Sequence, residues 1–216
     1  MPASPTTPQF DALISDPAHP VPYRRRPIQA TYDPRGSGWS TWLTEDQRFV
    51  DGRPDVLTYR TEVLQEDLTI GGDISVRLEA ATSGSDADWI VKLIDVYPES
   101  GMAEAQMNGY QLMVANDVLR GRYHQGFEHP TPIVPNEITT FTVDLHTQSY
   151  TFRKGHRVMV QVQSTWFPLI DRNPQTFVPN IFEAMETDFR TAEHRVYRSP
   201  ANASHIVLPV IRELTP

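Results

Sequence analysis

The amino-acid sequence predicts an all-β protein with the architecture of a jelly-roll β-sandwich. Apolar and polar residues alternate in many short runs within residues 56–216, as in strands that bury one face. Turn-forming residues separate these runs, and no helices alternate regularly with the strands, which argues against an α/β sheet. We therefore expect a single domain of two packed antiparallel sheets.

Residues 1–55 form a Pro-rich, irregular lead-in to this domain. Pro17, Pro20, Pro22 and Pro27 follow one another closely. Because proline fixes its own φ and restricts the preceding residue, they favour extended backbone. We expect this segment to pack over the surface of the sandwich, which itself spans residues 56–216.

The strands are expected at short intervals after the lead-in. The clearest are 57–63, 74–80 and 89–97, and the last is apolar on nearly both faces, which is typical of a central strand. Helical spacing of apolar residues occurs at 181–193, where we expect one short helix. Further strands are expected at residues 109–114, 117–124, 138–146, 156–165 and 204–211.

Composition narrows the classes of partner. The net charge of −8 argues against nucleic acid, which requires clustered Lys and Arg, and the one basic run, residues 24–26, fits a solvated turn. The chain has no cysteine, so disulfides and thiolate metal sites are excluded. No apolar run has the length of a membrane span, and residues 1–5 do not resemble a signal peptide. We expect neither nucleic acid nor membrane as a partner, and no compartment is indicated.

No serine lies in the sequence context of a nucleophile. The G-x-S-x-G turn of α/β-hydrolases is absent. Ser37 lies between two glycines without a preceding strand, and residues 83–85 form a polar turn between two strands. Loop roles fit these serines better than catalysis, so we expect no catalytic residue in this chain.

Metal and cofactor motifs are also missing. No zinc-protease, EF-hand, Walker or dinucleotide-binding motif occurs. His124 and His129 are close in sequence but lack a third ligand. Asp86 and Asp88 fit a capped turn better than a calcium loop, because the other spaced oxygen ligands are absent. We expect no metal and no cofactor.

Several motifs nevertheless resemble the C-terminal domain of one enzyme family. This family contains the X-prolyl dipeptidyl-peptidases, cocaine esterase and the α-amino-acid ester hydrolases related to glutaryl cephalosporin acylases. The resemblance covers about residues 16–211. It rests on TSGSDADW (82–89), VKLIDVYP (91–98), RGRY (120–123), SHIVLPV (204–210) and the stretch from Gly155 to Pro174. DGRPDVL (51–57) and DRNPQT (171–176) look most like the α-amino-acid ester hydrolases.

The resemblance implies that the parent protein is a serine hydrolase and that this chain lacks its active site. Members of the family have an α/β-hydrolase domain with a helical cap, followed by a galactose-binding-like jelly roll. The Ser–Asp–His triad lies in the first part, and residues 15–22 look like the connection downstream of it. We therefore expect the chain to be inactive alone. Its partner would be the α/β-hydrolase domain of the same parent chain, which would act on a small acyl ester or peptide.

Two groups of residues are candidates for a site. In the family an early loop of the jelly roll approaches the substrate pocket, and it corresponds to residues 27–46. We expect this loop to wall the pocket or contact the hydrolase domain; packing into the domain's own core is the open alternative. A second group, within 155–174, is expected as a structural cluster in which Asp171 and Arg172 form an ion pair that ties a loop to the sandwich. The candidate residues are Tyr32, Trp39, Trp42 and Leu43 for the wall, and Asp171, Arg172 and Asn173 for the polar cluster.

Other functions remain open at this point, because jelly rolls serve many purposes. One alternative is a carbohydrate- or ligand-binding module. Another is an oligomerisation domain, with a homo-oligomer as its product. Exposed aromatic side chains on one rim would favour sugar binding, whereas a large apolar patch would favour domain docking.

Overall fold

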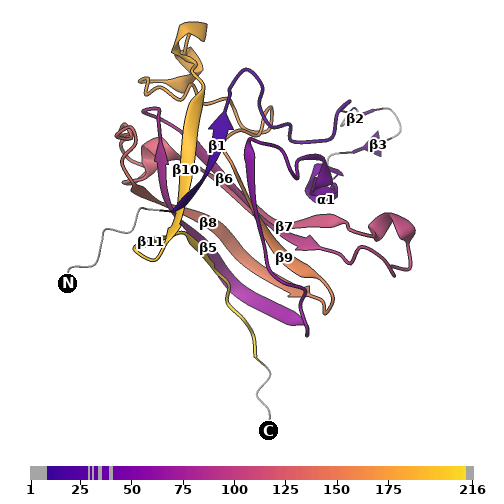
Figure 1. Ribbon diagram of the computed structural model, residues 1–216. Helices are drawn as coiled ribbons and strands as arrows, with labels where there is room; N and C mark the ends of the chain where they lie inside the picture. The colour runs from indigo at the N-terminus through magenta and orange to yellow at the C-terminus, as the bar shows by residue number, and fades with distance from the viewer. Residues whose placement is uncertain (1–8, 29, 31, 34–35, 39–40, 213–216) are drawn as a thin grey trace, which may run out of the picture.

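The computed structural model describes residues 9–212 except 29, 31, 34–35 and 39–40, and it is a β-sandwich (Figure 1). One antiparallel sheet has six strands and the other has four; a separate two-stranded pair lies in the lead-in. Helix is scarce, which confirms the predicted fold class. Among the described residues, no helix is long and apolar enough to cross a membrane.

The six-stranded sheet is built around the long strand β5 (Leu68–Thr82). β8 (Thr139–Phe152) pairs along one side of β5 for most of its length. The other side pairs with β12 (His205–Val207) and, near the end of β5, with β10 (Ala192–Ser199). Short strand β11 (Asn202–Ala203) pairs with β10.

The lead-in also supplies a strand to this sheet. β1 (Phe10–Ser15) pairs with β10 along its whole length. Leu13 and Ser15 are buried, whereas Ile14 between them is exposed, as expected for a strand with one face on the core. Part of the lead-in is therefore integral to the sandwich and does not simply run over its surface.

The four-stranded sheet has the order β4-β9-β6-β7. These strands are β4 (Val56–Arg60), β9 (Arg157–Gln163), β6 (Asp88–Val96) and β7 (Gln111–Arg120). Every residue of β6 is buried. The prediction of a central strand here is confirmed, because β6 pairs with β9 on one side and β7 on the other.

The core lies between the two sheets. From β6, the alternate residues Trp89, Val91 and Leu93 face it. They meet apolar residues of the opposite sheet, including Ile74, Val76, Leu78, Phe141, Val143 and Leu145. Burial of this surface is worth roughly 25 cal/mol per Å², so it is the main source of stability.

The lead-in covers the outer face of the four-stranded sheet. Val21 and Val50 pack on Val56, and the 3-10 helix η1 (Gln47–Phe49) follows the short helix α1 (Thr41–Thr44) across the same face. The two-stranded pair, β2 (Tyr32–Asp33) and β3 (Gly36–Ser37), precedes α1. This covering explains why β6 is buried on both faces.

Most expected strands are present with shifted ends. The two strands expected at 109–114 and 117–124 are one strand, β7, followed by the 3-10 helix η3 (Gly121–Tyr123). The strand expected at 204–211 is limited to β12, because Pro209 lacks the N–H that a continuing ladder needs. The 97–110 connection contains another 3-10 helix, η2 (Ala105–Met107).

The stretch expected to contain a short helix holds only two 3-10 turns. These are η4 (Ile181–Glu183) and η5 (Glu186–Asp188), and residues from Ala192 onward already form β10. The expectation of one short helix at 181–193 was therefore wrong, because the two 3-10 turns do not join into a helix and the last residues are extended. Phe182 and Met185 do not share a buried face; both are exposed.

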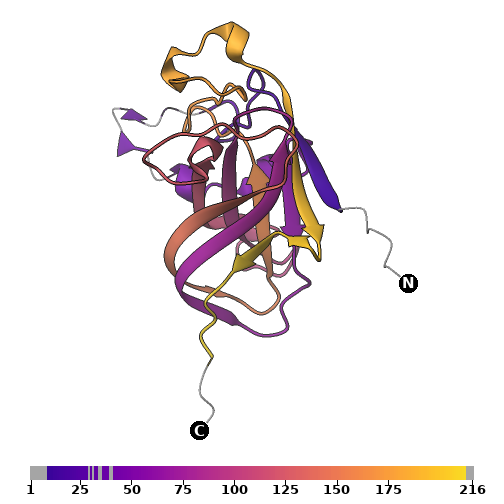
Figure 2. The same cartoon turned by 90° about the vertical axis from the view of Figure 1, so that its left-hand side faces the viewer.

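The two ends of the sandwich carry different loops. The lead-in leaves β1 and enters β4 at the end where β5 and β9 finish, but between these points it crosses the outer face as far as Tyr110, which donates to the backbone oxygen of Thr44. The connections 83–87, 121–138 and 164–191 lie at the same end. Within them, residues 171–191, which we call the crest, rise beyond both sheets in Figures 1 and 2. The opposite end has only the connections 61–67, 97–110 and 153–156.

Candidate functional site

The aromatic residues of the early loop are described only in part. Tyr32 lies in β2, where it pairs with Ser37. Trp39 lies outside the described residues. Trp42 and Leu43 lie in α1, where Trp42 is partly buried and Leu43 is 42% exposed. The pocket-wall role of these four residues stays a prediction.

Trp42 packs against a residue from the second candidate stretch. Its ring meets that of Trp166 edge to face, with centroids 5.8 Å apart. Trp166 is almost fully buried and packs with Ile90 and Met113 on the outer face of the four-stranded sheet. Two segments considered separately in the sequence therefore form one aromatic cluster.

A buried lysine lies beneath this cluster. Lys92 of β6 is fully buried, and its Nζ is 4.5 Å from the centre of the Trp166 ring. Nζ donates a hydrogen bond to Oε1 of Gln47 at 3.0 Å. Burial lowers the pKa of Lys92 to about 7. No role was predicted for this residue, although a single Lys inside an apolar strand is a visible signal in the sequence.

The second candidate group, residues 171–173, does not form one polar cluster. Asn173 is buried and donates from Nδ2 to Oδ1 of Asp88 at 2.9 Å, so it joins a polar cluster at the end of the sheet. Asp171 is exposed and does not pair with Arg172. Instead Arg172 lies 3.6 Å from Glu186 and stacks over Phe189.

The expected Asp171–Arg172 pair was therefore wrong in its partner. The crest folds back on itself, so that Glu186 and Phe189 near its end approach the guanidinium near its start. Arg172 also donates to the backbone oxygen of Pro17 at 3.3 Å. It therefore links the crest to the lead-in.

Two ion pairs fix the base of the crest. Arg122 donates from Nε to Oδ2 of Asp86 at 2.8 Å, and both side chains are fully buried. Arg120 lies 3.1 Å from Asp88. Desolvation raises the pKa of Asp88 to about 7, although Arg120 opposes this shift.

The serines near these ion pairs are used by the backbone. Ser83 Oγ accepts from the N–H of Glu193 and Ser85 Oγ accepts from the N–H of Phe177, both at 2.9 Å. None of the hydrogen bonds between described residues joins a serine to a histidine, the contact that activates a serine nucleophile. Nor do three His, Asp or Glu side chains gather as metal ligands in the described part of the chain.

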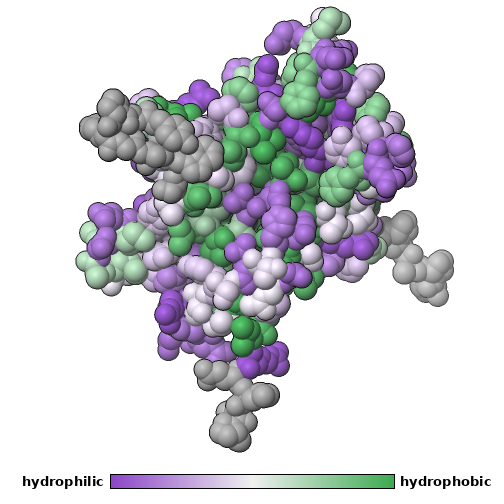
Figure 3. Space-filling model, turned by 180° about the vertical axis from the view of Figure 1, so that it is seen from behind, coloured by the Kyte–Doolittle hydropathy of each residue, from purple (hydrophilic) through white to green (hydrophobic). Residues whose placement is uncertain are grey.

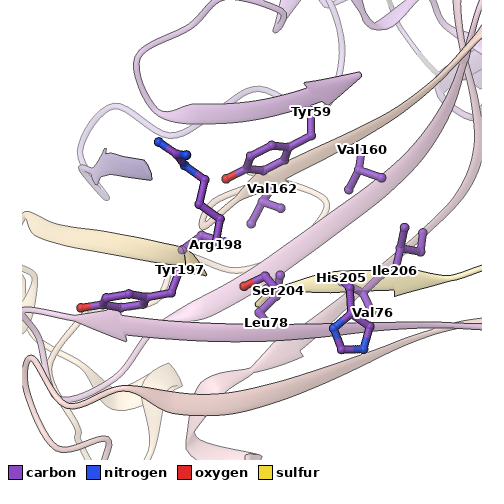
Figure 4. A pocket seen from close by; sticks show the side chains of 11 residues that line it. Tyr59, Val76, Leu78, Val160, Val162, Tyr197, Arg198, Ser204, His205 and Ile206 are labelled. Atoms are coloured by element: carbon purple, nitrogen blue, oxygen red, sulfur yellow. The ribbon is translucent and has the colours of Figure 1, made fainter. Parts of the chain in front are cut away.

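A separate pocket opens between the edges of the two sheets (Figure 4). It has a volume of about 280 Å³, and its walls are mainly aliphatic side chains such as Val76, Leu78, Val160 and Val162. Tyr59 and Arg198 lie on one side of it, and both contact Asp11 at 3.2 Å. The pocket has room for a small apolar group but offers few polar partners.

The sequence matches one protein family over residues 18–207, described as the X-Pro dipeptidyl-peptidase C-terminal non-catalytic domain. Among curated proteins, cocaine esterase of Rhodococcus sp. (strain MB1 Bresler) is 35% identical over 206 residues. That alignment covers 95% of this chain and 33% of the esterase. The chain thus spans about one third of the length of this relative.

Two solved structures superpose closely on the chain. An aminopeptidase from the marine sediment archaeon Thaumarchaeota archaeon is 47% identical, with a TM-score of 0.92 over 96% of this chain and 34% of the aminopeptidase. An α-amino acid ester hydrolase is 52% identical, with a TM-score of 0.90 over 97% of this chain and 33% of the hydrolase. In each case one third of a longer enzyme corresponds to nearly all of this sequence.

Proposed function

Because the chain belongs to the family of X-Pro dipeptidyl-peptidase C-terminal non-catalytic domains, we propose that it serves a serine hydrolase as an accessory domain. It would pack against an α/β-hydrolase domain of the same parent chain. The substrate of the parent would be a small acyl ester or peptide, as the names of the esterase, ester hydrolase and aminopeptidase relatives suggest.

The observation that carries this proposal is the coverage of the alignments. Nearly the whole chain corresponds to one third of each enzyme. The chemistry of the described residues agrees with this division, since the serines in the 83–85 turn accept backbone hydrogen bonds and have no base beside them. The catalytic groups would then lie in the other part of the parent.

Exposed apolar side chains mark a candidate docking surface at the crest end. Phe182 and Met185 are 76% and 67% exposed, and Phe167, in the 164–191 connection of the same end, is also exposed. Figure 3 shows hydrophobic residues gathered across the middle and upper part of the face opposite to that of Figure 1. Apolar area of this kind is costly to leave in water and is typical of an interface.

The loop that carries Trp42 would complete the substrate pocket. α1 is held on the sandwich by the contact between Trp42 and Trp166, while Leu43 projects outward. A short apolar wall on a fixed support suits the recognition of an acyl group or side chain. Tyr32 and Trp39 are candidates for the same wall.

A binding experiment tests the proposal. The α-amino acid ester hydrolase would be expressed without its own C-terminal domain and mixed with this chain, which we expect to bind it on a sizing column and to show no ester hydrolysis alone. The matched control is the hydrolase's own C-terminal domain. If that domain binds and this chain does not, the accessory role is contradicted.

The pocket between the sheet edges supports a second candidate, a ligand-binding module. Its lining combines aliphatic side chains with Tyr59 and Tyr197, which suits a small apolar or aromatic group. Saturable binding of small apolar compounds, lost on replacement of Val162 by a larger Phe, would support this function. Self-association of the chain would point instead to oligomerisation.

A further inference from the structure

Lys92 connects the sandwich to the segment that covers it. Its Nζ donates to Oε1 of Gln47 at 3.0 Å, and Gln47 is itself fully buried. The other side of the Gln47 amide, Nε2, donates to the backbone oxygen of Glu45 at 2.7 Å. The amide orientation is thereby fixed, and the lysine is tied to the backbone of residues 45–47.

A second connection runs through the aromatic rings. The amine lies 4.5 Å from the centre of the Trp166 ring, and Trp42 of α1 packs against that ring. The neutral amine keeps this contact as packing, whereas attraction between the ring and a protonated amine offsets part of the cost of burying the charge. Lys92 thus contacts η1 through Gln47 and reaches α1 through Trp166. We call residues 41–49, which contain both helices, the cover segment.

Among the described residues, no opposite charge pairs with the amine. Across β9 and β7 its paired residues are the neutral Gln161 and Asn116. In the cover segment, Asp46 is paired with Arg48, and the neighbouring Glu45 lies 3.7 Å from Arg24. None of the described ion pairs includes Lys92, and desolvation alone lowers its pKa to about 7. A buried cation without a counter-ion favours any motion that brings water to it.

We propose that Lys92 is a positioning residue and a proton-sensitive latch for the cover segment, which opens more readily when the amine takes up a proton. The functional meaning of the latch rests on the proposed function, because the segment carries the pocket-wall candidates Trp42 and Leu43. Proton uptake would then loosen one wall of the substrate pocket.

The direction of the pH effect follows from the linkage between proton binding and opening of the cover segment. In the closed state the pKa is about 7, whereas a lysine exposed by opening has a pKa of about 10.4. The open state therefore binds more protons between these values, and closing becomes more favourable as the pH rises from 7 towards 10. Below pH 7 the amine is protonated in both states, and the effect is constant.

Amide hydrogen exchange of the isolated chain tests the latch. After correction for intrinsic exchange rates, we expect the protection of residues 41–49 to rise roughly tenfold or more between pH 7 and pH 9. Lys92→Met keeps the approximate shape of the side chain and removes the amine that titrates. In this variant the protection of residues 41–49 should therefore not depend on pH. Lys154 is the other lysine of the chain and is exposed, which makes Lys154→Met the matched control that should behave as wild type.

A second measurement covers the case in which Lys92→Met does not fold. With lysine labelled at Cε with carbon-13, the wild-type chain gives two side-chain signals. A Lys92 signal that titrates near pH 7 supports the latch, and one that titrates near pH 10, as an ordinary exposed lysine does, overturns it. Equal pH dependence of protection in wild type and Lys92→Met also overturns it. Because the hydrolase domain is absent from both measurements, their outcome is independent of the docking experiment.

Discussion

At the scale of single residues, the stability of the crest end depends on charges that are buried in pairs. Asp86 and Arg122 are both fully buried, and Arg122 also stacks on Phe177 at 4.9 Å. Such a pair adds little net stability compared with apolar residues of the same shape, but either partner left alone is an uncompensated charge in a low-dielectric site. Replacing only one of the two residues should therefore destabilise the domain more than replacing both by apolar residues of similar shape.

We expect Arg122→Met to destabilise the chain by about 3–5 kcal/mol, because it leaves the Asp86 carboxylate buried without its partner. Urea unfolding followed by tryptophan fluorescence measures this loss. Arg153→Met is the matched control: it breaks an exposed pair with Asp67 and should cost less than about 1 kcal/mol. Similar small losses in both variants would contradict the importance of burial here.

At the scale of elements, the sequence predicts strands well where the inward positions are apolar. It predicts them poorly where polar residues occupy buried positions. β6 is recognisable because six of its nine residues are apolar. β10 is harder to recognise, because His194 is a polar residue at an inward position and is nevertheless fully buried. β1 was missed because six alternating residues lie within a Pro-rich segment.

The candidate site shows the same limit. Trp42 and Leu43 could be selected as large apolar residues in an irregular loop, but the contact of Trp42 with Trp166 depends on tertiary folding. The partner of Arg172 could not be predicted either, because Glu186 reaches it only when the crest turns back. Local patterns do not encode which distant side chain meets a given charge.

The role of β1 is testable with two neighbouring residues. Leu13 is buried and Ile14 is 49% exposed in the same strand. Leu13→Ala should cost about 2–5 kcal/mol, whereas Ile14→Ala should cost less than about 1 kcal/mol. Thermal or urea unfolding of both variants measures the difference. Equal, small effects would mean that β1 is not held on the core in solution.

At the scale of the whole molecule, the two ends of the sandwich are unequal. The crest end has long loops and the strongly exposed apolar side chains Phe182 and Met185. The other end has shorter connections, in which Asp67 pairs with Arg153 at the surface. This asymmetry suits a domain that presents one end to a partner and the other to water.

If the crest forms the proposed docking surface, changes at its exposed apolar side chains should weaken binding to the hydrolase domain and leave the fold intact. Replacing Phe182 and Met185 together by serine should weaken binding to the hydrolase domain at least tenfold, since both side chains are exposed and would lose apolar contact area. The free energy of unfolding of this double variant should change by less than about 0.5 kcal/mol. Val207→Ser removes an exposed apolar side chain from β12 and is the control that should bind normally. Unchanged binding by the double variant would exclude the crest from the interface.

The pairing of β1 with β10 has a consequence for how the chain reaches its native state. Phe10 pairs with Tyr197, so the two strands lie at opposite ends of the described sequence. A polypeptide that emerges from the ribosome N-terminus first must leave β1 without its neighbour until almost the entire domain has been synthesised. Pairings of such long sequence separation are slow to form, on the order of milliseconds to seconds, and the waiting edges can join other chains. Nascent chains stalled before residue 192 should therefore be prone to aggregation and should be recognised by chaperones.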